Sequence, residues 1–115
     1  MIISINRSKF RVKTVFSKKD TQNGMMRKKF DDTYNGMLFL MDGGEHCFWM
    51  KNCIINLDII FLNDGKITKI HHNCEPCNTK DCKNYCGNGN MILEVKGGTC
   101  KRLEINVGDK LEIKN

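Results

Sequence analysis

Apolar and polar residues alternate over residues 10–16, the pattern of a strand with one buried face. Further apolar runs of strand length follow at residues 37–41, 47–50, 57–62, 66–70 and 91–95. Asp64 and Gly65 separate two of these runs, and Asp-Gly in that position is a strong signal for a tight hairpin turn. Residues 105–113 are expected to form a last hairpin.

Helical signals are brief. Ser17 and Asp20 form a weak capping box before a short helical turn that is expected to end at Gly24. Residues 27–35 are polar and predict a loop, whereas residues 97–103 predict a turn or short helix. Many short strands with close turns predict a mainly β fold, a small closed or nearly closed antiparallel β-barrel or sandwich with one or two short helices.

The chain has 115 residues, of which 40% are hydrophobic and 28% charged, within the range of folded globular proteins. This length suits one hydrophobic core, so residues 1–115 are expected to form a single domain. A cysteine-rich loop is expected at about residues 71–89. No internal repeat or low-complexity tract interrupts the chain.

The formal net charge is +6, but the lysines and arginines are scattered in runs too short for a nucleic-acid-binding tail. We therefore expect a solvated basic surface, and nucleic acid is an unfavoured partner. The apolar stretch at the amino terminus is interrupted at Ser4 and Asn6, and no later segment approaches the length of a membrane span. These features predict no membrane partner and a cytoplasmic localisation, where thiols stay reduced.

Three blocks stand in order in the middle of the chain: Gly36-Met-Leu-Phe39, then Phe48-Trp-Met50 with Asn52, then Leu57-Asp-Ile59. They resemble the central signature of the domain of unknown function 192 family, also called uncharacterised protein family 0127. Flanking matches extend the resemblance to roughly residues 10–113; they are Ser17, Asp20, Gly24, Met25, Met26, Leu93, Glu94, Gly98, Gly108 and Asp109. The chain departs from the family pattern at Cys53, where threonine is usual, and at Asn56, where proline is usual. The resemblance implies a compact β-rich, barrel-like domain, and it implies no activity.

A possible ligand site is formed by Trp49, Met50, Asn52 and Asp58. Asp58 lies within the apolar run at residues 54–62, where a carboxylate is costly to bury unless it is paired or hydrogen-bonded. One reading is a satisfied polar network that fixes the geometry of the strands. The other is a pocket with an aromatic wall and a few polar groups, suited to a small ligand.

An enzyme would need Asp58 as its catalytic base, with help from Glu94 or a histidine, and a hydrolase or isomerase would be the expected class. No serine–histidine or cysteine–histidine arrangement with a third member can be identified from spacing. His71 and His72 adjoin a predicted strand end and are expected to be hydrogen-bonded edge residues. The leading hypothesis is therefore a non-enzymatic binding or accessory domain that takes a small ligand or a protein partner.

The loop cysteines follow the spacing C-x2-C-x4-C-x3-C at Cys74, Cys77, Cys82 and Cys86. This spacing allows one structural zinc site, and zinc is the favoured cofactor because the loop has few apolar residues to order it. A zinc-bound loop would resemble a zinc knuckle, which is the basis of a nucleic-acid-binding alternative. One or two disulfides or free thiols are the other possibilities.

The family resemblance implies a disulfide between Cys77 and Cys82, and in a fully oxidised loop Cys74 would pair with Cys86. The remaining cysteines, Cys47, Cys53 and Cys100, adjoin apolar segments and are expected to be buried small hydrophobic residues.

Overall fold

The computed structural model describes residues 1–114. Within these residues the elements are, in chain order, β1 (Ile2–Ile5), β2 (Ser8–Val15), α1 (Lys18–Asn23), β3 (Gly36–Leu40), β4 (Glu45–Trp49), β5 (Leu57–Asn63), β6 (Lys66–Cys74), β7 (Asn84–Asn88), β8 (Met91–Lys96), α2 (Thr99–Arg102) and β9 (Leu111–Ile113). The predicted mainly β fold with two short helices is confirmed.

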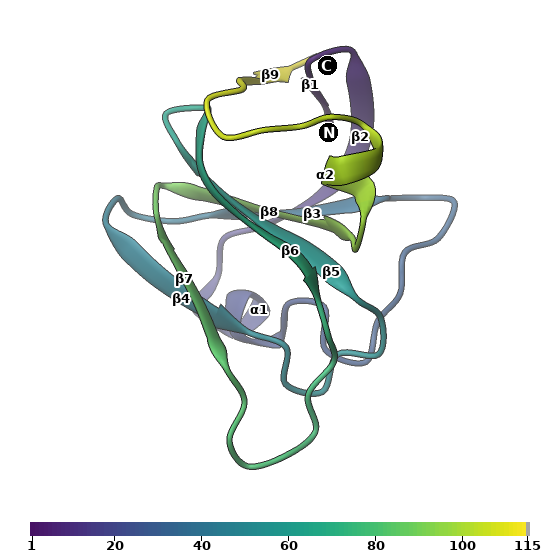
Figure 1. Cartoon of the computed structure of the whole chain (residues 1–115), viewed down its shortest axis with the longest axis vertical. Coiled ribbons are helices and arrows are strands. Elements are labelled where there is room, and N and C mark those ends of the chain that lie inside the picture. The colour runs from purple at the N-terminus through teal and green to yellow at the C-terminus, as the bar shows by residue number, and fades with distance from the viewer. Residues whose placement is uncertain (115) are drawn as a thin grey trace.

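Seven strands form one curled sheet in the order β6-β5-β8-β3-β2-β1-β9, and β4 pairs with β7 in a separate two-stranded ribbon (Figure 1). The two edges of the large sheet approach each other at the end that carries both chain termini. There Lys66 and Lys110 form an isolated bridge, and the Leu111 amide donates to the Gly65 carbonyl over 2.7 Å. The large sheet is therefore a half-barrel that is nearly closed at one end.

The sheet is not wholly antiparallel, because β2 and β3 run parallel to each other. The connection between them includes α1, and parallel neighbours require such a crossover. The predicted hairpin at residues 105–113 is also wrong, since β9 is the only strand there and it pairs with β1. β1 and β7 were not expected, and both depend on partners that are set by the tertiary fold.

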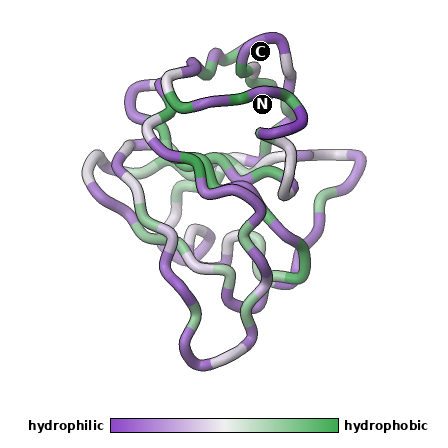
Figure 2. The backbone as a smooth tube through the Cα atoms, viewed as in Figure 1, coloured by the Kyte–Doolittle hydropathy of each residue, from purple (hydrophilic) through white to green (hydrophobic). Residues whose placement is uncertain are grey.

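Side chains on the two faces of the central strands pack into two hydrophobic clusters. The first, inside the curled sheet, includes Ile60 and Leu93, and the second, between the sheet and the β4–β7 ribbon, includes Ile59 and Ile92. Figure 2 shows hydrophobic residues where the central strands cross and mostly hydrophilic residues in the long loop between β6 and β7. Because successive side chains of a strand point to opposite faces, β5 and β8 contribute to both clusters.

Both ends of α1 match the sequence prediction. The Ser17 hydroxyl accepts a hydrogen bond from the Asp20 amide over 3.1 Å and caps the first turn. Gly24 ends the helix at a φ of 44°, a conformation that favours glycine. Within the part of the chain that the structure describes, no helix has the length and apolar character needed to cross a membrane.

Candidate functional site

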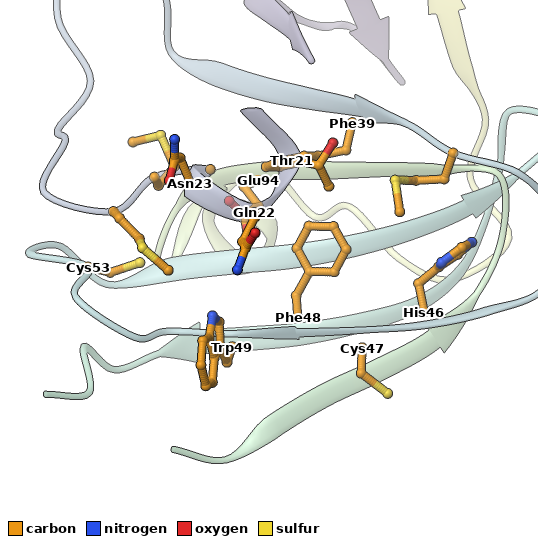
Figure 3. Close-up of a pocket in the computed structure, with 14 residues that line it drawn as sticks. Thr21, Gln22, Asn23, Phe39, His46, Cys47, Phe48, Trp49, Cys53 and Glu94 are labelled. Atoms are coloured by element: carbon orange, nitrogen blue, oxygen red, sulfur yellow. The ribbon is translucent and has the colours of Figure 1, made fainter. Parts of the chain in front are cut away.

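A cavity of about 260 Å³ lies between α1, β3 and β4, on the side of the sheet that faces the β4–β7 ribbon (Figure 3). Its apolar wall includes the aromatic rings of Phe39, Phe48 and Trp49. Polar residues of the last turn of α1, among them Gln22, line another part of it. In Figure 3 the Glu94 carboxyl group lies behind Gln22, with Phe48 to one side and Trp49 below. The cavity thus combines an aromatic wall with a single acidic group.

Glu94 reaches the cavity because of its place in β8. Its strand neighbours are Met37 in β3 and Ile59 in β5, so it occupies the middle of the sheet. Alternation along β8 turns Glu94 toward the ribbon, while Leu93 and Val95 point into the half-barrel. Glu94 is 3% exposed as a residue, and no described residue gives its side chain a hydrogen bond or an ion pair. Among the described residues no fully buried side-chain oxygen lacks a hydrogen-bond partner, so the Glu94 carboxyl oxygens open onto the cavity.

Burial determines the protonation of Glu94. Removal from water raises the pKa of the Glu94 carboxyl from 4.5 to about 8, because burial penalises the charged form. The Cys53 thiol lines the same cavity, and burial, with a smaller contribution from the Glu94 charge, raises the pKa of this thiol to about 12. Glu94 can therefore hold a proton at neutral pH and release it when a positive group arrives.

The aromatic wall is part of a continuous series of edge-to-face contacts. The Phe48 ring stands against Phe39 with centroids 4.9 Å apart and against Phe61 with centroids 6.2 Å apart. Phe61 in turn contacts His71, whose Nε2 lies 2.8 Å from the Cys86 carbonyl oxygen. This packing holds Phe48 in place, whereas Trp49, which is 43% exposed, lies where the cavity meets solvent.

The ribbon that carries this wall is fixed by a disulfide. Cys47 and Cys86 are opposite each other in the β4–β7 pairing and are joined by a disulfide, with their Cα atoms 4.0 Å apart. β7 also passes very close to the core, since a Cβ added at Gly87 would lie 2.5 Å from Phe61 Cγ. Isolated two-stranded ribbons are marginally stable, so the disulfide ties β4 to β7, and the Phe48 and Gly87 contacts pack the ribbon on the sheet.

The structure separates the predicted ligand residues. Trp49 lines the cavity, but Met50 is buried in the hydrophobic cluster and Asn52 lies in a turn with a φ of 59°. The Asn52 backbone links two loops, because its amide donates to the Cys77 carbonyl over 2.9 Å and its carbonyl accepts from the Arg27 amide over 2.8 Å. Of the predicted set, only Trp49 belongs to the cavity described above.

Asp58 lies on the other face of the sheet, where it is fully buried. Its Oδ1 accepts hydrogen bonds from the amides of Asn73 over 2.8 Å and Gly98 over 3.1 Å, and its Oδ2 accepts one from the Cys100 amide over 2.8 Å. Burial, and to a smaller extent the Asp58 charge, raises the pKa of the neighbouring Cys100 thiol. These contacts tie α2 and the end of β6 to β5, as in the polar-network reading.

Glu94 is the candidate site residue that the sequence pattern marks only weakly. The sequence predicts it as a helper for Asp58, although Glu94 interrupts the apolar run at residues 91–95 just as Asp58 interrupts its own run. A buried carboxylate is costly at both positions. Which of the two carboxyls lacks partners depends on the three-dimensional contacts.

The four loop cysteines do not form the predicted zinc site. Cys77 is joined to Cys82 by a disulfide, Cys86 is joined to Cys47, and Cys74 is a buried free thiol. A sulfur in a disulfide has no thiolate to offer a metal. Among residues 1–114, no group of three or more histidine, cysteine or acidic side chains is placed to hold a metal ion.

The pairing of Cys77 with Cys82 agrees with the family resemblance, whereas the expected partnership of Cys74 with Cys86 is wrong. Cys47 is also exposed and disulfide-bonded instead of being a buried thiol, while Cys53 and Cys100 are buried as expected. Disulfides persist mainly in oxidising compartments, so these two pairs weigh against the cytoplasmic localisation, which stays a prediction.

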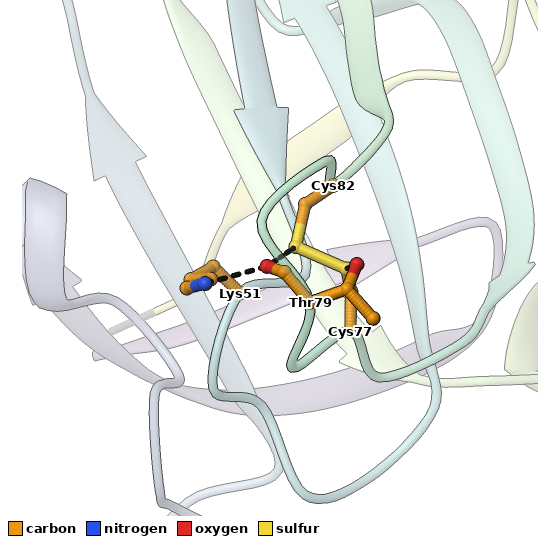
Figure 4. Close-up of a disulfide and its surroundings, with 4 residues drawn as sticks. All are labelled: Lys51, Cys77, Thr79 and Cys82. Carbon is orange, nitrogen blue, oxygen red and sulfur yellow. Dashed lines mark hydrogen bonds between the residues drawn. A yellow bond between two sulfur atoms is a disulfide. The ribbon is translucent and has the colours of Figure 1, made fainter.

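Backbone contacts order the loop without a metal. The Cys77 amide donates to the Met50 carbonyl over 3.0 Å, and Lys51 and Cys77 form a parallel bridge. The Lys51 ammonium donates to the Thr79 carbonyl over 2.6 Å beside the Cys77–Cys82 disulfide (Figure 4). The loop therefore needs no metal to be ordered, because it packs on the segment after β4.

Comparison with known families places the chain. The model of domain of unknown function 192, described as an uncharacterized ACR, matches residues 1–113. The chain belongs to this family. The match covers the cavity, the half-barrel and the cysteine loop. A search of curated proteins finds no match.

Two crystal structures are similar to this chain over nearly its whole length. One, from Novosphingobium aromaticivorans, is a protein of unknown function with 30% sequence identity; it aligns over 97% of this chain and 84% of its own, with a TM-score of 0.85. The other, from Sinorhizobium meliloti, is described as a candidate transcription regulator; it has 27% identity over 96% of this chain and 91% of its own, also with a TM-score of 0.85. Both structures have the same fold as this chain.

Proposed function

We propose that this domain of unknown function 192 protein is a non-enzymatic binding domain whose ligand enters the cavity between α1, β3 and β4. The observation that carries the proposal is Glu94, a residue 3% exposed whose carboxyl group opens onto a cavity with aromatic walls and has no partner among the described residues. Small-molecule sites typically combine a mostly apolar lining with a few polar groups that orient the ligand. A cavity of about 260 Å³ suits a ligand of modest size.

The arrangement gives less support to an enzyme that uses Asp58. Both Asp58 oxygens accept hydrogen bonds from backbone amides, and the group faces the half-barrel instead of the cavity. A general base needs to reach the substrate proton, and Asp58 does not line the cavity that Trp49 and Glu94 share. We therefore favour binding over the hydrolase or isomerase alternative.

The proposal can be tested with the neutral fluorophore N-phenyl-1-naphthylamine and two variants of α1. Gln22→Trp places a large ring in the cavity lining, while Lys19→Trp adds the same ring on the same helix outside the lining. We expect saturable binding at one site in the wild type, a loss of tenfold or more in Gln22→Trp, and no change in Lys19→Trp. Absence of saturable binding to the wild type, or equal binding to both variants, would overturn the proposal.

A nucleic-acid-binding role is the second candidate. It is favoured by the net charge of +6 and by the description of the Sinorhizobium meliloti relative. If the charge is only a solvated surface, nucleic acid should bind weakly, without sequence preference, and roughly 200 mM salt should abolish the binding. Submicromolar binding that survives this salt concentration would promote the second candidate.

A further inference from the structure

We infer that the ligand of this cavity is a small organic cation, an amine or methylated ammonium ion with compact apolar substituents, whose charge pairs with Glu94 and whose substituents contact Phe39, Phe48 and Trp49. The inference rests on the proposed function, since it names the class of ligand for the same cavity. It follows from three features of the cavity: an acid without a partner, a lining that offers no competing cation, and aromatic walls.

The acid lacks a positive partner although the chain carries a net charge of +6. No lysine or arginine lines the cavity, and among residues 1–114 no ion pair involves Glu94. The nearby Lys28 ammonium instead donates to the Gly24 carbonyl over 3.1 Å. His46, the one histidine in the lining, has its Nε2 2.6 Å from the Asp42 carbonyl oxygen. The position opposite Glu94 is therefore left for a ligand.

The aromatic walls suit a cation better than they suit an anion or a strongly polar neutral group. The faces of phenylalanine and tryptophan rings attract cations, most strongly where water is excluded, and methylated ammonium ions are typical ligands of such sites. Phe39 is fully buried and Phe48 is half-buried, so these rings line the part of the cavity farther from solvent than the exposed Trp49. An anion would meet the negative faces of the rings and the Glu94 carboxylate together.

Binding of a cation moves one proton. The protonated carboxyl of Glu94 releases its proton to solvent, and the resulting carboxylate pairs with the incoming ammonium, so charge within the cavity is balanced. The pKa of about 8, which results from burial alone, makes this release accessible near neutral pH. The groups that face Glu94 from neighbouring elements do not compete: Met37 and Ile59 are neutral, and the thiols of Cys53 and Cys74 have pKa values raised by burial to about 12 and about 11.

The test uses choline and its uncharged carbon isostere 3,3-dimethylbutan-1-ol, which have nearly the same shape. Calorimetry or one-dimensional NMR titration would give the affinity of each probe for the wild type and for Glu94→Gln. We expect choline to bind the wild type at least tenfold more tightly than the isostere, and Glu94→Gln to lose this preference. As the pH is raised toward about 8, choline affinity should increase about tenfold per pH unit, and above about pH 8 it should level off. Well below pH 8 one proton should be released for each cation bound.

The outcomes separate the two proposals. Equal affinity of both probes for the wild type would overturn the cation inference and leave the binding proposal intact. If neither probe binds and N-phenyl-1-naphthylamine also fails to bind, both proposals fall. A preference for choline that persists in Glu94→Gln would place the cation elsewhere and overturn the assignment to Glu94. If Glu94→Gln does not fold, proton release and the pH profile of the wild type still decide, since a flat profile contradicts the inference.

Discussion

Asp58 and Glu94 lie on adjacent strands, one register position apart, and their side chains point to opposite faces of the same sheet. Both residues are buried, but the Asp58 carboxylate accepts three backbone hydrogen bonds whereas the Glu94 carboxyl opens onto the cavity and has no partner among the described residues. The two groups have similar chemistry, and their contacts give them different roles. One holds the fold together, and the other is available to a ligand.

Asp58→Ala should lower the free energy of unfolding by about 3 kcal/mol, because it leaves the buried Cys100 amide and the partly buried amides of Asn73 and Gly98 without their acceptor. Denaturant unfolding measures this directly. Asp32→Ala is the matched control, since Asp32 is exposed and its side chain makes no hydrogen bond or ion pair with any described residue. A change as small in Asp58→Ala as in the control would contradict the network.

Glu94 should make stability depend on pH. Its pKa is 4.5 for the unfolded chain and about 8 in the folded protein. The contribution of Glu94 to the free energy of unfolding is therefore fully present below about pH 4.5 and is lost as the pH rises to about 8. The facing thiols of Cys53 and Cys74 do not titrate in this range, and His46 in the cavity lining is present in both the wild type and Glu94→Gln. The free energy of unfolding of Glu94→Gln should therefore increase relative to that of the wild type between pH 5 and pH 8.

The gain should amount to a few kcal/mol, because each tenfold change in proton affinity corresponds to about 1.4 kcal/mol. Urea unfolding of both proteins at a series of pH values measures it. Glu112→Gln, at an exposed position, should keep a constant difference from the wild type over the same range. A constant difference for Glu94→Gln as well would show that its carboxyl is not buried in the folded protein.

Much of the fold could be predicted from local patterns. The strands at residues 37–41, 57–62 and 91–95 were visible as apolar runs, and Ser17 and Gly24 marked the ends of α1. Such signals are local, because side-chain periodicity and capping depend on residues close in sequence. Membership of the family could also be recognised from ordered blocks of residues.

The candidate site was harder to predict because it depends on contacts between distant segments. The β4–β7 ribbon pairs Cys47 with Cys86, and nothing in the spacing of seven cysteines determines such a partner. Trp49 and Glu94 meet at one cavity only because β4 packs over the face of β8 that carries Glu94. Asp58 differs from Glu94 because the end of β6 and the start of α2 supply amide donors on its face of the sheet.

Loss of the Cys47–Cys86 disulfide should cost more than loss of Cys77–Cys82. The first closes a sequence separation of 39 residues and the second one of 5, which corresponds to about 4 and about 2 kcal/mol of chain entropy in the unfolded state. The double variants Cys47→Ser/Cys86→Ser and Cys77→Ser/Cys82→Ser form a matched pair for denaturant unfolding. Only the first should also weaken binding at the cavity, since Cys47 belongs to its lining. Equal effects of the two variants on binding would show that the ribbon does not depend on its disulfide.

Gly87→Ala should destabilise the protein by about 1–3 kcal/mol, the usual cost of forcing an extra carbon into a packed core. The added Cβ would lie 2.5 Å from Phe61 Cγ, closer than carbon atoms approach in folded proteins, so β7 or the Phe61 ring must move. Movement of either would disturb the contact between Phe61 and Phe48 and hence the aromatic wall of the cavity. Gly43→Ala is the control, because a Cβ there meets nothing within 4 Å, and its effect should stay within about 0.5 kcal/mol. Thermal and denaturant unfolding compare the two variants, and equal stability would mean that β7 does not pack on Phe61 as closely as described.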